Sequence, residues 1–90
     1  MTTSYHGARK LHRYLLKRWD QDIKDSGDGP LLFGKEKWEQ IGLGGGDGSG
    51  IIWEGFYEWT RDSELDKMQA LLKGSGLQVF PTARWMLEVF

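Results

Sequence analysis

The sequence contains no cysteine, and this absence excludes a disulfide framework and any thiolate chemistry. A chain without cysteine fits a reducing compartment, so we expect a cytoplasmic location. No apolar run approaches the length of a transmembrane helix, and the first residues are too polar for a secretory signal. We therefore expect no membrane partner. At 90 residues the chain is long enough for one domain at most, spanning residues 1–90.

Residue types that carry catalysis are also scarce. The two histidines, His6 and His12, would point in different directions on a helix, and no acid lies near either one to orient its ring. Glu54 and Glu58 would lie roughly 13–14 Å apart on a strand, which is farther than the paired acids of glycosidases. The glycine-rich segment lacks the lysine and hydroxyl that follow a phosphate-binding loop. We expect no enzymatic activity, no cofactor and no metal site.

What the chain has in abundance is aromatic side chains, with five tryptophans, three tyrosines and four phenylalanines. Each aromatic side chain buries roughly 150–250 Å², so a small core can be stable without crosslinks. The densest group falls in Ile51–Thr60, where alternation predicts a strand with two different faces. One face carries Ile51, Trp53, Tyr57 and Trp59, with Gly55 as a gap, and the other carries Ile52, Glu54, Phe56 and Glu58.

The pattern along the rest of the chain predicts helices and strands with one loose loop. The expected elements, in chain order, are a helix over Ser4–Lys24, a short helix over Lys35–Ile41, a flexible glycine-rich loop over Gly42–Gly50, the strand Ile51–Thr60, a helix from Asp62 or Ser63 to Gly74, and the strands Leu77–Phe80 and Ala83–Phe90. The run Pro30–Phe33 is apolar but short, and Pro81 is expected to mark a turn or a bend. This order predicts a small α+β domain, with about three helices packed on one face of a three-stranded, mostly antiparallel sheet.

Neither assignment of the strand faces buries all the aromatic area of so small a domain. Exposed aromatic side chains bordered by charge are typical of a protein-binding patch. Our leading hypothesis is a small non-enzymatic protein that binds a protein partner, of the inhibitor, immunity or anti-defence type. The candidate contacts are Glu54, Phe56, Glu58, Arg84 and Phe90. With Phe56 exposed, Phe56→Ala is expected to weaken partner binding without unfolding the domain.

Two alternatives rest on other residues. The first nineteen residues carry five basic side chains and no acid, although the net charge of the whole chain is −1. A nucleic-acid-binding module would use this basic face of the first helix, formed by Arg9, Lys10, Arg13, Lys17 and Arg18. A third hypothesis is a small-ligand pocket around Gly55, lined by Trp53, Tyr57, Trp59 and Trp85. The pattern leaves the oligomeric state and the strand order open.

Overall fold

The structure is a computed structural model that describes residues 4–34, 37, 48–58 and 61–90, without the side chains of residues 57, 58, 61 and 62. Its elements, in chain order, are helix α1 (Ser4–Arg18), helix α2 (Asp20–Ser26), strand β1 (Leu31–Phe33), strand β2 (Ser49–Ile52), the 3-10 helix η1 (Glu54–Glu58), helix α4 (Arg61–Leu71), strand β3 (Val79–Ala83) and strand β4 (Met86–Val89). The predicted α+β class is confirmed. The predicted helix Lys35–Ile41 and most of the predicted loop Gly42–Gly50 lie outside the described residues.

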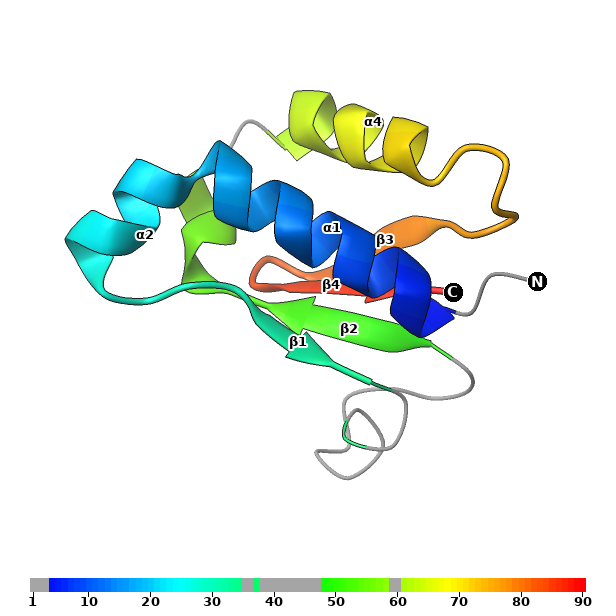
Figure 1. Ribbon diagram of the computed structural model, residues 1–90, viewed down its shortest axis with the longest axis horizontal. Helices are drawn as coiled ribbons and strands as arrows, with labels where there is room; N and C mark the ends of the chain where they lie inside the picture. Colours follow the sequence, from blue (N-terminus) through cyan, green and yellow to red (C-terminus); the bar gives the residue numbers. More distant parts are fainter. Residues whose placement is uncertain (1–3, 35–36, 38–47, 59–60) are drawn as a thin grey trace.

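Four strands form one antiparallel sheet in the order β1-β2-β4-β3 (Figure 1). The sequence predicts three strands, and the one it misses is β1, which pairs with β2 at an edge of the sheet. β1 is only three residues long, which is too short for a two-residue alternation to stand out. β2 also begins earlier than predicted, because Ser49 and Gly50 pair with β4 instead of belonging to the loop.

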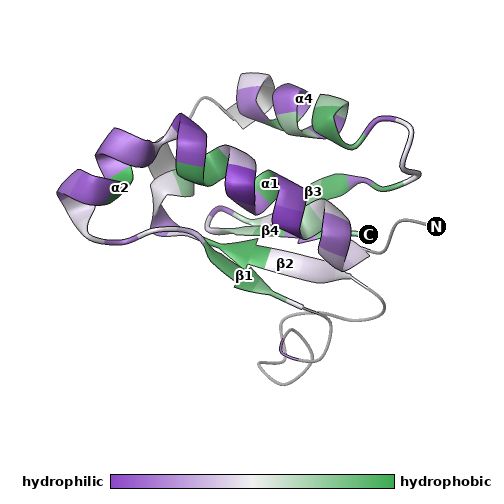
Figure 2. Cartoon of the chain, in the orientation of Figure 1, coloured by the Kyte–Doolittle hydropathy of each residue, from purple (hydrophilic) through white to green (hydrophobic). Residues whose placement is uncertain are grey.

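One face of the sheet forms the core together with the helices. The pairing of Ile51 with Leu87 and of Val79 with Val89 places these four side chains on the same face. α1 lies across this face, and α4 contacts α1 and β3 (Figure 1). Apolar bands separate hydrophilic ones along α1, as its three- and four-residue spacing predicts (Figure 2). The helix side chains buried in the core include Ala8, Leu11 and Leu15 from α1 and Met68 from α4.

The predicted helix Ser4–Lys24 is two helices with a break at Trp19. Trp19 has φ −114° and ψ 23°, and α2 starts at the next residue. The break turns the Trp19 ring toward Trp53, and the two ring centroids lie 6.1 Å apart. α2 then ends at Gly27, which has φ 78° and donates its N–H to the Ile23 carbonyl. This left-handed helix cap is the one that the sequence predicts.

The predicted strand Ile51–Thr60 is wrong from Trp53 to Glu58, and Trp59 and Thr60 lie outside the described residues. The Trp53 N–H bonds to the Trp85 carbonyl, and the chain then winds into η1. Residues three apart in a 3-10 helix lie above one another, so Trp53, just before η1, and Phe56 come into edge contact with their centroids 5.3 Å apart. Phe56 is 3% exposed and belongs to the core, which corrects the expectation that it faces solvent.

The C-terminal hairpin also differs from the prediction around Pro81. β3 runs through Pro81, which the sequence predicts to end the strand, and β4 begins only at Met86. Proline lacks the N–H that a strand in the middle of a sheet would donate. It is accommodated because β3 is an edge strand whose register shifts between Phe80 and Ala83.

Candidate functional site

The residues predicted to form the protein-binding patch do not come together on one surface. Phe56 is in the core. Glu54, at the start of η1, and Arg84, in the turn between β3 and β4, are exposed at one end of the sheet. Phe90 follows the opposite end of β4 and is 48% exposed. The side chain of Glu58 lies outside the part that the structure describes.

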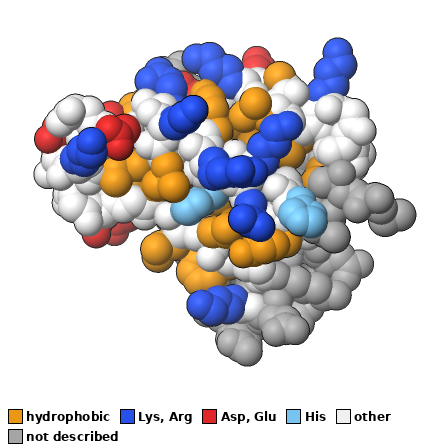
Figure 3. Space-filling model, viewed as in Figure 1, with side chains coloured by type: hydrophobic (Ala, Val, Ile, Leu, Met, Phe, Trp, Pro, Cys, Tyr) orange, Lys and Arg blue, Asp and Glu red, His pale blue; other side chains and the backbone are white. Residues whose placement is uncertain are grey.

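The predicted basic residues lie along one helix, and three of the five line a groove. Lys10, Arg13 and Lys17 follow one another at three- and four-residue steps on α1, and all three are exposed. Figure 3 shows blue side chains clustered over α1 with apolar surface between them. The other two basic residues stack on aromatic rings, Arg9 over Tyr5 at 5.9 Å and Arg18 over Trp19 at 4.8 Å.

The groove lies between α1 and α4 and has a volume of about 540 Å³. Its floor is apolar: Tyr14 and Leu16 come from α1, and Leu71 comes from the end of α4. Leu16 is 39% exposed. Lys10, Arg13 and Lys17 complete the lining. An apolar floor with cations around it can take a segment that carries both apolar and acidic side chains. We refer to these six residues as the basic groove.

A buried carboxylate ties the two walls of the basic groove together. Glu64 of α4 is 4% exposed and accepts a hydrogen bond from the Tyr14 hydroxyl at 3.2 Å. Its other oxygen lies 3.6 Å from Arg18 Nη2 and 3.8 Å from Lys67 Nζ. Buried charges need this kind of pairing to offset their desolvation. The network therefore connects α4 to α1 beside the groove.

The network around Glu64 can be tested by measuring the stability of the protein at alkaline pH, where the Tyr14 hydroxyl ionises. Burial, followed by the nearby negative charge of Glu64, raises the pKa of Tyr14 above its usual range. Because this pKa is higher in the folded state, the protonated Tyr14 hydroxyl stabilises the fold at every pH below about 10, the pKa of tyrosine in the unfolded chain. This stabilisation is lost as the pH rises through the pKa of Tyr14 in the folded state. Urea unfolding across this range should therefore show a smaller alkaline loss of stability for Tyr14→Phe than for the wild type. Equal losses would contradict the assignment.

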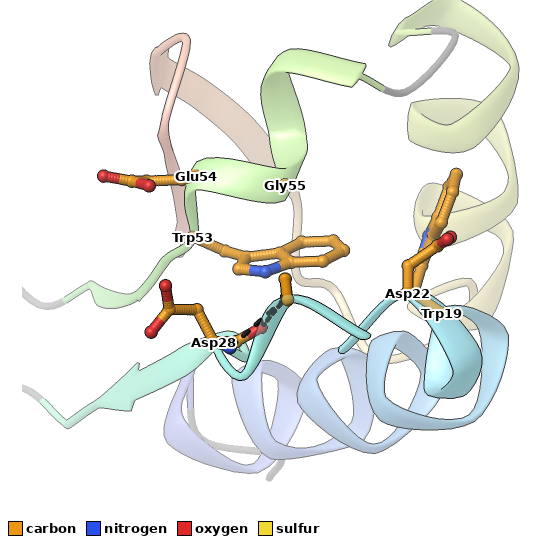
Figure 4. Close-up of a pocket in the computed structure, with 7 residues that line it drawn as sticks. Trp19, Asp22, Asp28, Trp53, Glu54 and Gly55 are labelled. Carbon is orange, nitrogen blue, oxygen red and sulfur yellow. Dashed lines mark hydrogen bonds between the residues drawn. The ribbon is translucent and has the colours of Figure 1, made fainter. Parts of the chain in front are cut away.

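A second candidate site lies where the bend between α1 and α2 meets η1. A cavity of about 340 Å³ is lined there by residues of α2 and η1 and by residues that flank these two elements, namely Trp19, Asp22, Ser26, Asp28, Trp53, Glu54 and Gly55 (Figure 4). We call it the tryptophan cavity. Of the residues in the third hypothesis, Trp53 and Gly55 line this cavity. Trp85 supplies a backbone carbonyl to Trp53 but does not line the cavity, and the side chains of Tyr57 and Trp59 lie outside the described residues.

Sequence reasoning missed Trp19, Asp22 and Asp28 as members of this site. Trp19 and Asp22 come from the first helical region and Asp28 from the turn after it, all about thirty residues before Trp53. Trp19 fits the apolar stripe of a continuous helix, and the two aspartates fit an ordinary helix end and turn. The break at Trp19 brings these residues beside Trp53, and the apolar spacing of the sequence gives no signal of that break.

In the part of the chain that the structure covers, no three or more histidine, cysteine, aspartate or glutamate side chains are grouped so that they could hold a metal ion. Among the same residues, no helix has the length and apolar character needed to cross a membrane. Comparison with known proteins finds no matching family model, no similar curated protein and no similar solved structure.

Proposed function

We propose that this chain is a small non-enzymatic protein that binds an acidic, amphipathic segment of a protein partner in the basic groove. The observation that carries the proposal is the combination of Lys10, Arg13 and Lys17 with an apolar floor between two helices. A partner helix would lay its apolar face on the floor and its carboxylates beside the cations. The partner in this proposal is a protein, as in our leading sequence hypothesis, but the binding surface is α1 and α4 instead of the sheet.

The apolar floor favours a protein segment over a nucleic acid. Phosphates would use the three cations but would leave the apolar surface of Leu16 and Leu71 without a partner. The net charge of −1 also opposes a long polyanion. An inhibitor, immunity or anti-defence protein in the cytoplasm would suit such a site, because these proteins act through a rigid surface and need no chemistry of their own.

Nucleic-acid binding is the second candidate, and the five cations of α1 without a single acid favour it. A phosphate-binding helix would show a steep loss of affinity with salt and little dependence on the apolar floor. The same chain can therefore be tested for both functions with the same variants.

The test uses a helical peptide with leucines on one face and glutamates on the other, together with its lysine counterpart. Titration calorimetry should show that the wild type binds the glutamate peptide more tightly. Charge reversal in Lys10→Glu/Lys17→Glu should weaken this binding by about tenfold or more, since each exposed ion pair contributes up to about 1 kcal/mol. The reversed groove should then prefer the lysine peptide.

The control is Lys24→Glu, which reverses one charge on α2, at a lysine that pairs with Asp20 at 2.9 Å outside the groove. It should leave both affinities unchanged. Equal binding of the two peptides by the wild type, or equal losses in the groove and control variants, would contradict the proposal. Tight, salt-sensitive binding of short DNA or RNA without peptide binding would replace it with the second candidate.

A further inference from the structure

The two helices that form the basic groove run in opposite directions, so the end of α1 and the start of α4 meet at the same end of the groove (Figure 1). Arg18 is the last residue of α1, and Glu64 and Lys67 lie one turn apart near the start of α4. Lys67 also lies one turn before Leu71 of the groove floor, so both share one face of α4. Each of the two helices therefore places a cation at this end.

Arg18 is held in one orientation by two contacts. Its guanidinium carbon lies 4.8 Å from the centre of the Trp19 ring, and its Nη2 atom lies 3.6 Å from Oε1 of Glu64. These contacts occupy one face and one edge of the planar group, whereas a guanidinium carries five N–H donors in a fixed fork. The side chain is 46% exposed, so the remaining donors can reach a ligand. An arginine that is already ordered loses less entropy when it binds.

Lys67 approaches the same carboxylate oxygen from the other helix. Its Nζ atom lies 3.8 Å from Oε1 of Glu64, and the second oxygen of Glu64 accepts a hydrogen bond from the Tyr14 hydroxyl. Glu64 is 4% exposed, whereas the Lys67 side chain is 54% exposed, so the cations lie on the solvent side of a buried carboxylate. One negative charge cannot neutralise two positive charges. This end of the groove therefore keeps a positive charge that can accept another anion.

The chemistry of the two cations indicates which anion fits. The fork of an arginine matches the two oxygens of a carboxylate, and the ammonium group of Lys67 can share one of these oxygens. The partner segment proposed above brings carboxylates on one helical face and apolar side chains on another. An ordered arginine that meets one of those carboxylates would contribute strongly to the affinity, as arginines often do at protein interfaces. It would also fix the position of the segment along the groove.

We propose that Arg18 and Lys67 bind a single carboxylate of the partner segment between α1 and α4, and that this contact sets the register of the segment on the apolar floor. The inference rests on the function proposed above, because it names the residues that recognise the same partner. Trp19 and Glu64 hold Arg18 in place, while the cations of the basic groove meet the other carboxylates along α1.

The test uses titration calorimetry with the same glutamate peptide and with a series in which one glutamate at a time is replaced by glutamine. Arg18→Lys keeps a positive charge beside Glu64 but removes the fork, and it should weaken the parent peptide by about fivefold. In the wild type, one glutamine peptide should show a loss of similar size. Arg18→Lys and Lys67→Gln should bind that peptide as well as the parent, because the contact is already lost. A merely structural role would weaken every peptide alike.

The matched control for Arg18→Lys is Arg9→Lys, at another exposed arginine of α1 that stacks on a ring, here Tyr5 at 5.9 Å, and is not part of the basic groove. The control for Lys67→Gln is Lys24→Gln on α2. Both controls should keep the wild-type affinity for every peptide.

The outcomes separate this inference from the proposed function. If the wild type binds the glutamate peptide but Arg18→Lys and Arg9→Lys behave alike, or if all glutamine peptides lose affinity equally, the inference alone is overturned. If the wild type does not bind the glutamate peptide, both the inference and the proposed function are overturned. A dispersed amide spectrum of each variant establishes that it is folded.

Discussion

Phe56→Ala is expected to destabilise the protein by about 3–5 kcal/mol, the usual range for removing a buried phenylalanine ring. Phe56 is buried in the core and packs edge to face on Trp53. Truncation leaves a cavity beneath η1 and removes the ring that holds Trp53 from one side. In a domain of this size, a loss of 3 kcal/mol lowers the melting temperature by more than about 10 °C. Thermal and urea unfolding monitored by circular dichroism measures both quantities.

The chain offers a matched control for this result. Phe80 lies on the edge strand β3 and is 58% exposed, so Phe80→Ala should change the stability by about 0.5 kcal/mol or less. If Phe56→Ala proved as mild as Phe80→Ala, the placement of η1 against the core would be wrong. Such a result would return Phe56 to the set of candidate surface contacts.

The second large effect is expected for Gly55→Ala. A methyl group at this position would overlap the Cε2 and Cζ2 atoms of Trp53, a rigid ring that cannot move aside because Trp19 and Phe56 pack against it. Overpacking of a core costs about 1–3 kcal/mol, and we expect a value at the upper end of this range. Urea unfolding gives the free energy, and the fluorescence of the folded state reports the displacement of the indole.

Gly34→Ala is the control for Gly55→Ala. Among the described residues, a methyl group on Gly34 would meet only the ring of Tyr5 at 3.3 Å, and this tyrosine is exposed and able to shift. The substitution should therefore be close to neutral. If Gly55→Ala were equally neutral, the close contact between the η1 backbone and the Trp53 ring could not be present in the folded protein.

The basic groove and the tryptophan cavity carry opposite charge on neighbouring helices. The basic groove uses cations of α1, whereas the tryptophan cavity uses acids of α2 and η1, and the break at Trp19 separates them.

Features that depend on neighbours along the chain were predictable. The spacing of Ala8, Leu11 and Leu15 places them on one helix face whatever lies opposite, and the cap at Gly27 needs only a left-handed residue after the last turn. The basic side of the groove was predictable for the same reason, because Lys10, Arg13 and Lys17 share a face of a single helix. The α+β class followed from the order of such local patterns.

The errors fall where distant segments meet. Alternation in Ile51–Thr60 fits a strand, but the contact of Trp53 with Trp85 and with Phe56 ends β2 and forms η1. β1 gains its stability from pairing with β2, and its three residues carry no pattern of their own.

The same distinction applies to the candidate sites. A sequence shows which side chains share an element, and so it identified the cations of α1 and the Trp53–Gly55 segment. The apolar floor needs Leu71 from α4, and the acidic side of the tryptophan cavity needs Asp22 and Asp28 from the other side of the break at Trp19. These contacts between distant elements are determined by their packing free energy. That free energy depends on the shapes of both surfaces and not on the periodicity of either sequence segment.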